Sequence, residues 1–287
     1  MIGKYRRTLE FYGRLLRHGY VTRCSKPVSQ SPVGGAVVDV SVLDLRERRS
    51  LSFHMFRDRL FLLTEFMVGG HYLRQIALIR DRLRTRGIDR PLGIVDAGAN
   101  VGLFSLFCHI KIGVDIPMRV VGFEPFSENA ELCVENWRRN RLTFDVRHEA
   151  LAAASTPGAP LYVLSTVGAT INRAEVDAYL QARGARTIPT ETVSISTLDA
   201  LLPRLDLQRV DLLKLDIEGA EELALRGAEA TIRQHEPFIL CSYEHHQNDK
   251  AAIIAIVEAI SPRYRVEDDP HTRLLTFIPP VDTALEH

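Results

Sequence analysis

The sequence lacks the features that would direct a protein to a membrane or to a nucleic acid. Lys plus Arg and Asp plus Glu both number 36, so the formal net charge is zero and no long-range field attracts a nucleic acid or an anionic membrane. No run of about 18 apolar residues could span a bilayer. The basic N-terminus has no apolar segment of the kind that signal peptides contain. We therefore expect a cytoplasmic protein that binds neither a membrane nor a nucleic acid.

Cysteine is scarce and has no motif spacing. The four cysteines are far apart, and no Cys-x-x-Cys pair occurs. Three of them lie in apolar stretches, so we interpret all four as reduced rather than as disulfides or zinc ligands. The apolar content of 46% is ample for a core. The length predicts one large domain, or one domain plus an extension.

The most informative stretch is residues 93–102, where a short apolar strand runs into a glycine-bearing turn. Asp96, Gly98, Asn100 and Gly102 alternate there, and an apolar run that can open a buried helix follows. A strand, a glycine turn and a helix begin a nucleotide-binding βαβ unit. The second glycine of a dinucleotide fingerprint is missing, because Asn100 takes its place and would crowd a pyrophosphate.

An acid ahead of such a turn suits a cationic or amino group better than a phosphate. The spacing fits a ligand that has a ribose and an amino acid end but no phosphate, and S-adenosylmethionine is such a ligand. We predict that it contacts Asp96, Gly98, Ala99, Asn100 and Gly102. The alternative is that the glycines only permit a tight junction between strand and helix.

Further cofactor contacts are predicted at the ends of the next two strands. Glu124 follows the apolar run 119–123, and an acid there accepts hydrogen bonds from both ribose hydroxyls. Pro125 forces a turn directly after it. Glu149 and Ala150 follow strand 142–147, where adenine commonly packs in such folds.

Apolar periodicity predicts an α/β fold whose mostly parallel, seven-stranded sheet carries helices on both faces and a C-terminal antiparallel hairpin. The strands are expected at 93–96, 119–123, 142–147, 210–217, 238–242, 264–267 and 274–278. Helices are expected at 58–87, after Leu103, and at 128–139, 174–183, 220–233 and 249–260. Residues 155–192 are otherwise expected to be irregular, with short strands at 161–164 and 192–195.

Residues 1–56 stand outside this pattern. They predict an amphipathic helix over 1–20, a loop over 21–35, and a hairpin with strands at 38–42 and 51–55. We therefore expect three parts, an N-terminal extension, 1–56, a main domain, 57–284, and a tag remnant, 285–287. No cofactor motif lies in the extension, so we expect it to be separable from cofactor binding. It could cover the site, pair subunits in a homodimer or only pad the fold, and the last is the interpretation we prefer.

The second informative stretch is 210–222, a buried strand that carries two charged residues on one face. Lys214 and Asp216 must pair or face a cavity, because a lone buried charge costs several kcal/mol. Glu218 follows at the turn into the next helix. These acids then lie at the carboxyl edge of the sheet, where open α/β sheets bind ligands. A purely structural pair of Lys214 with Asp216 is the alternative.

Two further sets of polar residues lie near predicted element ends. Glu244 and His245 follow strand 238–242 and are candidates for a catalytic base. His71 and Tyr72 follow the break at Gly69-Gly70 and could line a pocket, although core packing is the interpretation we prefer.

Together these blocks resemble the FkbM-type methyltransferase family over roughly residues 60–280. The resemblance is carried by residues 95–102, Phe123-Glu124-Pro125, the block Lys214–Glu221, and Glu244-His245. It implies a class I methyltransferase, Rossmann-like sheet, S-adenosylmethionine as cofactor, and O-methylation of a hydroxyl on a sugar or natural product. Residues 174–186 and the extension depart from the family pattern and leave the small-molecule acceptor unidentified.

The function that we predict is S-adenosylmethionine-dependent O-methyl transfer. Lys214, Asp216, Glu218, Glu244 and His245 are the candidate catalytic residues, and Asp216 also contacts the cofactor. A divalent ion such as Mg²⁺ on Asp216, Glu218 and Glu244 is an alternative that we do not expect. The rival functions are a nicotinamide-dependent oxidoreductase, which Asn100 argues against, and a non-catalytic module that binds S-adenosylmethionine.

Overall fold

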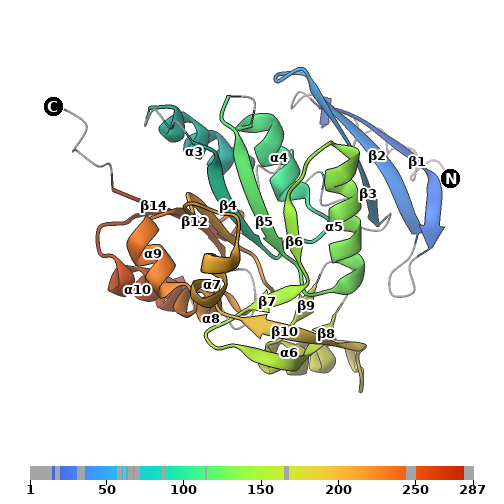
Figure 1. Ribbon diagram of the computed structural model, residues 1–287. Coiled ribbons are helices and arrows are strands. Elements are labelled where there is room, and N and C mark those ends of the chain that lie inside the picture. The colour runs from blue at the N-terminus through green and yellow to red at the C-terminus, as the bar shows by residue number, and fades with distance from the viewer. Residues whose placement is uncertain are drawn as a thin grey trace.

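The centre of the molecule is a seven-stranded sheet with the strand order β13-β14-β12-β11-β4-β5-β6 (Figure 1). The computed structural model describes residues 15–16, 20–30, 36–56, 60, 63, 67, 72–85, 88, 90–113, 115–164, 168–243 and 250–280. The sheet strands are β4 (Leu92–Ala97), β5 (Met118–Phe123), β6 (Asp145–Arg147), β11 (Leu212–Leu215), β12 (Phe238–Ser242), β13 (Arg265–Asp269) and β14 (Leu274–Ile278). Six of them run in the same direction, and β14 alone is reversed, so it pairs antiparallel with both β12 and the edge strand β13. The predicted fold class is confirmed.

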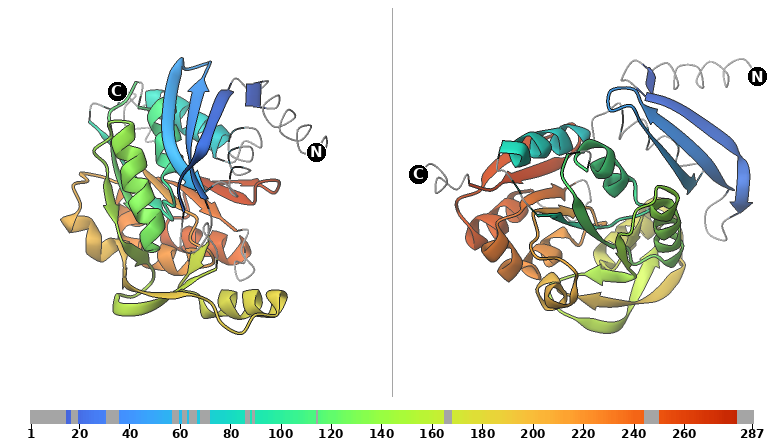
Figure 2. Two further views of the ribbon diagram at one scale, coloured as in Figure 1. Left: turned by 90° about the vertical axis from the view of Figure 1, so that its right-hand side faces the viewer. Right: turned by 45° about the horizontal axis from the view of Figure 1, so that its top comes forward.

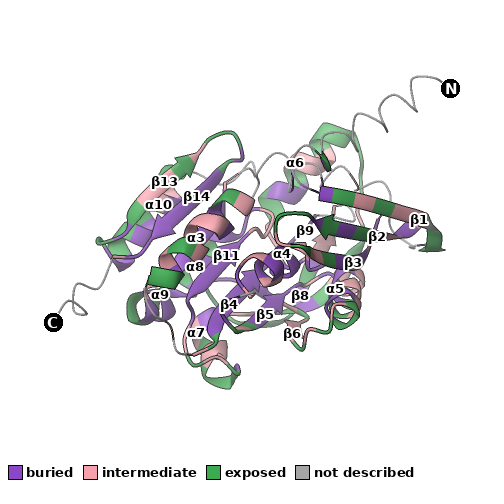
Figure 3. Ribbon diagram, turned by 90° about the horizontal axis from the view of Figure 1, so that it is seen from above, coloured by how far each residue is buried: buried purple, intermediate pink, exposed green. Residues whose placement is uncertain are grey.

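The middle strands of this sheet are buried on both faces. Every residue of β4, β11, β12 and β14 is buried, and Figure 3 shows the centre of the sheet in the colour of buried residues. Parallel strands covered by helices on both sides require continuous apolar runs. The charged residues Asp96 and Lys214 interrupt these runs, and both lie next to the functional site described below.

Two sets of helices cover the two faces. The first set packs with Ile94, Val120 and Leu240 in one core cluster, and comprises α3 (Leu73–Thr85), α4 (Leu103–Lys111) and α5 (Ser127–Arg139). The second set packs with Val95, Val121 and Ile239, and comprises α7 (Leu198–Leu201), α8 (Glu221–Arg226), α9 (Glu229–His235) and α10 (Lys250–Ile260). The 3₁₀ turn η2 (Leu202–Arg204) extends α7. Within the described parts of the chain, each helix is too short or too polar to cross a membrane.

The predicted helix 220–233 is two helices, which is a correction. A Cβ on Gly227 would lie 2.0 Å from the main-chain oxygen of Ala152, so the chain must carry glycine at this contact. Gly227 itself stays near the helical region, and the break follows at Ala228, whose φ of −118° and ψ of 13° are not helical, so α8 ends at Arg226 and α9 begins at Glu229. The predicted helix 58–87 is described from Leu73 to Thr85, and most of its first half lies outside the described residues.

The N-terminal region forms a second sheet of three antiparallel strands, β1 (Tyr20–Gln30), β2 (Ala36–Asp44) and β3 (Arg49–Phe56). The hairpin of β2 and β3 matches the prediction, but the predicted loop over 21–35 is wrong, because β1 occupies most of it. Pro27 lies at an irregularity in the pairing of β1 with β2, where a missing N–H is tolerated. The predicted helix over 1–20 falls almost wholly outside the described residues. Figures 1 and 2 show this sheet beside α5, away from α9 and α10.

A third sheet, which the sequence analysis does not predict, covers part of the carboxyl edge of the large sheet. Its order is β7-β10-β8-β9, with β7 (Glu149–Leu151), β8 (Thr156–Val163), β9 (Ala169–Thr170) and β10 (Thr190–Ser196). The predicted strands 161–164 and 192–195 are parts of β8 and β10, and the predicted helix 174–183 is α6 (Arg173–Arg183). Residues 155–160 have no apolar alternation, so the sequence gives little sign that β8 begins at Thr156.

Candidate functional site

A cavity of about 260 Å³ opens at the carboxyl edge of the large sheet, where the strand order reverses between β4 and β11. Ligands of open α/β sheets bind at such a switch point. Ten of the residues predicted for the site line this cavity: Gly98, Ala99, Asn100, Glu124, Pro125, Glu149, Ala150, Lys214, Asp216 and Glu218. Asp96 and Gly102 do not line it, and Glu244 and His245 lie outside the described residues.

The turn after β4, residues 98–102, forms one wall of the cavity, and its conformation needs glycine. Gly98, Asn100 and Gly102 all have positive φ angles, of 75°, 51° and 85°. A Cβ on Gly98 would lie 1.9 Å from the main-chain oxygen of Asp216, and one on Gly102 would lie 2.5 Å from the indole nitrogen of Trp137. The glycines therefore let the turn pack between β11 and α5, as well as letting the backbone approach a ligand.

Glu124 ties this turn to the end of β5. Its carboxylate is only 5% exposed, and its two oxygens accept hydrogen bonds from the main-chain N–H groups of Asn100, at 2.8 Å, and Phe126, at 3.0 Å. Burial raises the pKa of Glu124 to about 7, although these two N–H groups and Lys214 act in the opposite direction. The site thus contains a buried acceptor whose charge changes near neutral pH.

Lys214 lies beneath the turn and joins β11 to β4. Its Nζ donates to the main-chain oxygens of Gly98, at 2.7 Å, and Ala97, at 3.1 Å. It lies 3.3 Å from Asp96 and 4.0 Å from Asp216. Burial alone would lower the pKa of Lys214, but the charges of Asp96 and Asp216 raise it above its usual range.

Lys214 is therefore paired mainly with Asp96, and not mainly with Asp216 as the alternative of a purely structural pair of Lys214 with Asp216 requires. The Asp96 carboxylate is fully buried and also accepts a hydrogen bond from Ser105 Oγ, at 2.6 Å. This places Asp96 under the turn rather than on the cavity wall. A direct contact of Asp96 with the amino group of a ligand consequently has no support in the geometry.

Asp216 faces the cavity. Its hydrogen-bond partner is Tyr72, a residue for which the sequence favours packing in the core. The Asp216 side chain is 26% exposed, and its Oδ2 accepts a hydrogen bond from the Tyr72 hydroxyl, at 2.9 Å. The Tyr72 ring is buried edge-to-face on Phe104, with 5.1 Å between ring centroids, so Tyr72 both packs in the core and lines the cavity. Its φ angle of 64° is uncommon for an aromatic residue. His71 lies outside the described residues.

The turn after β11 presents Glu218 to the cavity and is held by a buried acid. Glu218 and Gly219 have positive φ angles, of 56° and 92°. The carboxylate of Glu221, which is fully buried, accepts from the N–H groups of Ile217, at 2.7 Å, and Gly219, at 3.0 Å. Thr170 Oγ1 donates to the main-chain oxygen of Glu218, at 2.7 Å. Glu221 is a supporting residue that the predicted site omitted, although it stands in the block 214–221.

Comparison with known proteins places the chain in a family. A model described as "Methyltransferase FkbM domain" matches residues 96–275, which is more than half of the chain. The chain belongs to the FkbM methyltransferase family. Its large sheet is accordingly a class I methyltransferase sheet, as the sequence predicts.

Individual relatives are distant. Methyltransferase sdnD of Sordaria araneosa is 28% identical over 158 residues, which are 47% of this chain and 60% of that protein. The crystal structure of methyltransferase FkbM from Methylobacillus flagellatus KT matches 66% of this chain and 44% of that chain, with 21% identity and a TM-score of 0.48. The S-adenosylhomocysteine-bound methyltransferase PaMTH1 of Podospora anserina matches 72% and 78%, with 14% identity and a TM-score of 0.38. This FkbM-family chain thus spans less than two thirds of the length of the first two.

Proposed function

We propose that this FkbM-family chain transfers a methyl group from S-adenosylmethionine to a hydroxyl of a small molecule such as a sugar or natural product. The observation that carries the proposal is Glu124, a buried carboxylate held by two N–H groups on the wall of a cavity beside a glycine turn. A carboxylate so placed can accept hydrogen bonds from the two hydroxyls of a ribose. The family match supports methyl transfer as the reaction.

The cavity fits the chemistry of this cofactor. Leu151, Leu161 and Ile171 give it an apolar region that suits a purine ring, and Glu149 and Ala150 lie on the same wall. Asp216 and Glu218 add carboxylates to the cavity lining, which suit a molecule with an amino group and a sulfonium. Asn100 occupies the place where a dinucleotide-binding turn needs glycine, which disfavours a nicotinamide cofactor.

The bound cofactor would supply an activated methyl group, so the residues of the chain mainly have to position the two reactants. Positioning can contribute up to about 7–11 kcal/mol in well-oriented reactions. We propose that Lys214 fixes the turn through the oxygens of Ala97 and Gly98, and that Tyr72 fixes the Asp216 carboxylate. A base that takes the hydroxyl proton contributes about 10²–10⁴-fold. Glu244 and His245 stay our candidates for that base, and Asp216 and Glu218 shape the acceptor side.

The experiment has two steps, which separate binding from reaction. Calorimetry with S-adenosylmethionine, S-adenosylhomocysteine and NAD tests the cofactor, and we expect the first two to bind and the third not to. Incubation with methyl-labelled S-adenosylmethionine and a panel of glycosides, polyols and macrolides then tests transfer. Tight binding without transfer to any acceptor would favour a non-catalytic module, and binding of NAD alone would refute the proposal. Activity that is lost with a chelator and restored by Mg²⁺ would indicate a metal-assisted step.

A further inference from the structure

Two asparagines of helix α5 pair with the edge of the N-terminal sheet. Asn136 Oδ1 accepts from the N–H of His54, at 2.6 Å, and its Nδ2 donates to the oxygen of the same residue, at 2.9 Å. Asn140 makes the same two bonds with Ser52, at 3.1 Å and 2.8 Å. Each side-chain amide thus exchanges both hydrogen bonds with one residue of β3, as a residue on a neighbouring antiparallel strand would do.

The spacing of the two elements allows this double pairing. Four residues of an α-helix rise about 6 Å, and two residues of a β-strand rise about 6.6–6.8 Å, so positions 136 and 140 match positions 54 and 52. The other edge of β3 is paired with β2. Arg139 adds charged contacts from the same helix, with its Nη2 at 2.6 Å from Asp39 Oδ1 and 3.1 Å from Ser52 Oγ. The edge of the N-terminal sheet is therefore closed by α5.

The two asparagines differ in the third hydrogen bond that each side chain makes. The second hydrogen of Asn136 Nδ2 is donated to the main-chain oxygen of Val101, at 2.7 Å. Val101 belongs to the glycine turn and lines the cavity. Asn140 Nδ2 instead donates to the main-chain oxygen of Asn136 within the helix, at 2.7 Å. Because Asn136 is fully buried and uses all of its amide hydrogens and its oxygen, its orientation is fixed from both sides.

We propose that Asn136 is a positioning residue that fixes the glycine turn, residues 98–102, and that the N-terminal sheet supports the cofactor site through it. The path runs from β3 through Asn136 to Val101, and from the adjoining Asn100 N–H to the Glu124 carboxylate. None of the described residues before Tyr72 lines the cavity, so this support is indirect. The sequence predicts that the extension is separable from cofactor binding, and this indirect support argues against that prediction.

This inference rests on the proposed function, because the ligand of the turn is taken to be S-adenosylmethionine. The test compares Asn136→Ala with Asn140→Ala in the full chain, since both lose one amide pair with β3 but Asn136→Ala alone of the two loses the bond to Val101. Calorimetry measures the affinity for S-adenosylhomocysteine. Hydrogen exchange of residues 98–102 is measured without ligand, and thermal denaturation reports the stability of both variants.

We expect Asn136→Ala to bind S-adenosylhomocysteine about 3- to 10-fold more weakly than the wild type, as the loss of one buried hydrogen bond implies. Asn140→Ala should stay within about twofold of the wild type. Exchange over 98–102 should be faster in Asn136→Ala than in Asn140→Ala. If Asn136→Ala does not fold, Asn136→Ser replaces it in the same comparison.

Equal affinities and equal exchange in the two variants would overturn the inference. If the wild type does not bind S-adenosylhomocysteine, the proposed function fails. The exchange of the ligand-free turn then still decides whether Asn136 holds it, so the two failures are distinguishable.

Discussion

At the scale of single residues, Glu124 is the side chain on which cofactor affinity should depend most directly. Its carboxylate lines the cavity and is oriented by two main-chain N–H groups. Removing a charge-assisted hydrogen-bond acceptor costs about 1.5–3 kcal/mol. We therefore expect Glu124→Ala to weaken binding of S-adenosylhomocysteine roughly 10- to 100-fold in calorimetry. An unchanged affinity would remove Glu124 from the ribose site.

The same carboxyl group predicts a pH dependence of binding. Burial raises the pKa of Glu124 to about 7, so the ligand-free site is partly protonated at neutral pH. The ionised form accepts two hydroxyl hydrogens, so binding should release a proton, and affinity should rise with pH until it levels above about pH 7. Below that value it should fall by up to about tenfold per pH unit. Calorimetry across this range should show a flat profile in Glu124→Gln, and an equally steep profile in that variant would contradict the assignment.

Asp216 and Asp96 both lie near Lys214, but their environments predict different roles for the two residues. Lys214 keeps Asp96 and two main-chain oxygens when Asp216 is changed, so Asp216→Asn should cost about 1 kcal/mol of stability or less. The methyl-transfer rate of Asp216→Asn should nevertheless fall by about 10²-fold or more, because Asp216 lines the cavity and a misplaced reactant costs about that factor. Thermal denaturation of the apo protein beside the transfer rate measures both.

Asp96→Asn is the matched control for Asp216→Asn. It removes the nearest charge from a buried lysine and should cost about 3–5 kcal/mol of stability. If Asp216→Asn instead lowered the melting temperature as much as Asp96→Asn and left transfer intact below it, the role of Asp216 would be structural.

At the scale of elements, what the sequence predicts well are features that depend on local pattern. The central strands β4, β5, β11 and β12 are predicted because buried parallel strands are short apolar runs. The turn 98–102 and Glu124 are predicted because a close approach of backbone to ligand constrains residue types at fixed spacing. β1 and the first half of β8 are missed, since Lys26-Pro27 and the stretch 155–160 carry turn-forming residues rather than apolar alternation.

What the sequence does not predict depends on contacts between residues far apart in the chain. The Tyr72 hydroxyl meets Asp216 across 144 positions, and Asn136 meets His54 across 82. A tyrosine or an asparagine has no local pattern that marks such a partner. The pairing of Lys214 with Asp96 is missed for the same reason, because it joins β11 to β4 and not two residues of one strand.

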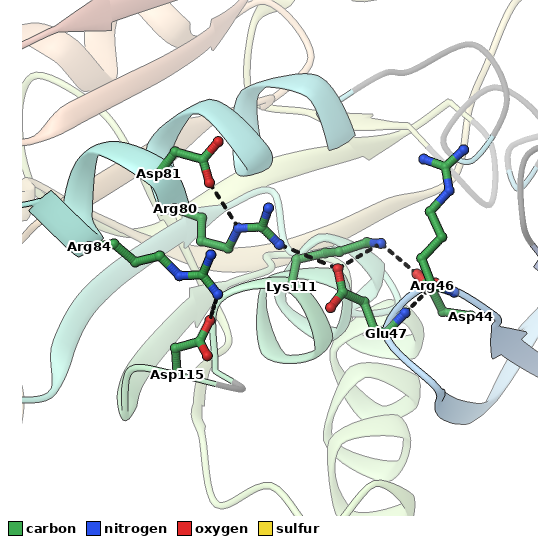
Figure 4. Close-up of polar contacts among 8 residues, drawn as sticks. All are labelled: Asp44, Arg46, Glu47, Arg80, Asp81, Arg84, Lys111 and Asp115. Carbon is green, nitrogen blue, oxygen red and sulfur yellow. Dashed lines mark hydrogen bonds and ion pairs between the residues drawn. The ribbon is translucent and has the colours of Figure 1, made fainter.

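At the scale of the whole molecule, an ion-pair network joins the N-terminal sheet to the main domain. Figure 4 shows Lys111, at the end of α4, reaching Asp44, the last residue of β2, and Glu47 of the turn that follows it. Its Nζ lies 2.6 Å from Asp44 and 3.4 Å from Glu47, and Arg80 of α3 lies 3.3 Å from the same Glu47 oxygen. Asp44 is fully buried and Lys111 only 12% exposed, so this contact is shielded from solvent and salt.

This network predicts that the N-terminal sheet and the main domain unfold together. Lys111→Met keeps the aliphatic stem but leaves the buried Asp44 carboxylate without its charged partner, so it should cost about 3 kcal/mol or more of unfolding free energy. The control is Arg84→Met, which breaks the more exposed pair of Arg84 with Asp115 in the same region and should cost about 1 kcal/mol or less (Figure 4). Calorimetric and denaturant unfolding of the full chain should show one cooperative transition, shifted strongly by Lys111→Met and weakly by Arg84→Met. Two separate transitions, of which Lys111→Met lowers only the first, would instead show that the N-terminal sheet unfolds independently, and its support of the glycine turn would then be lost before the main domain melts.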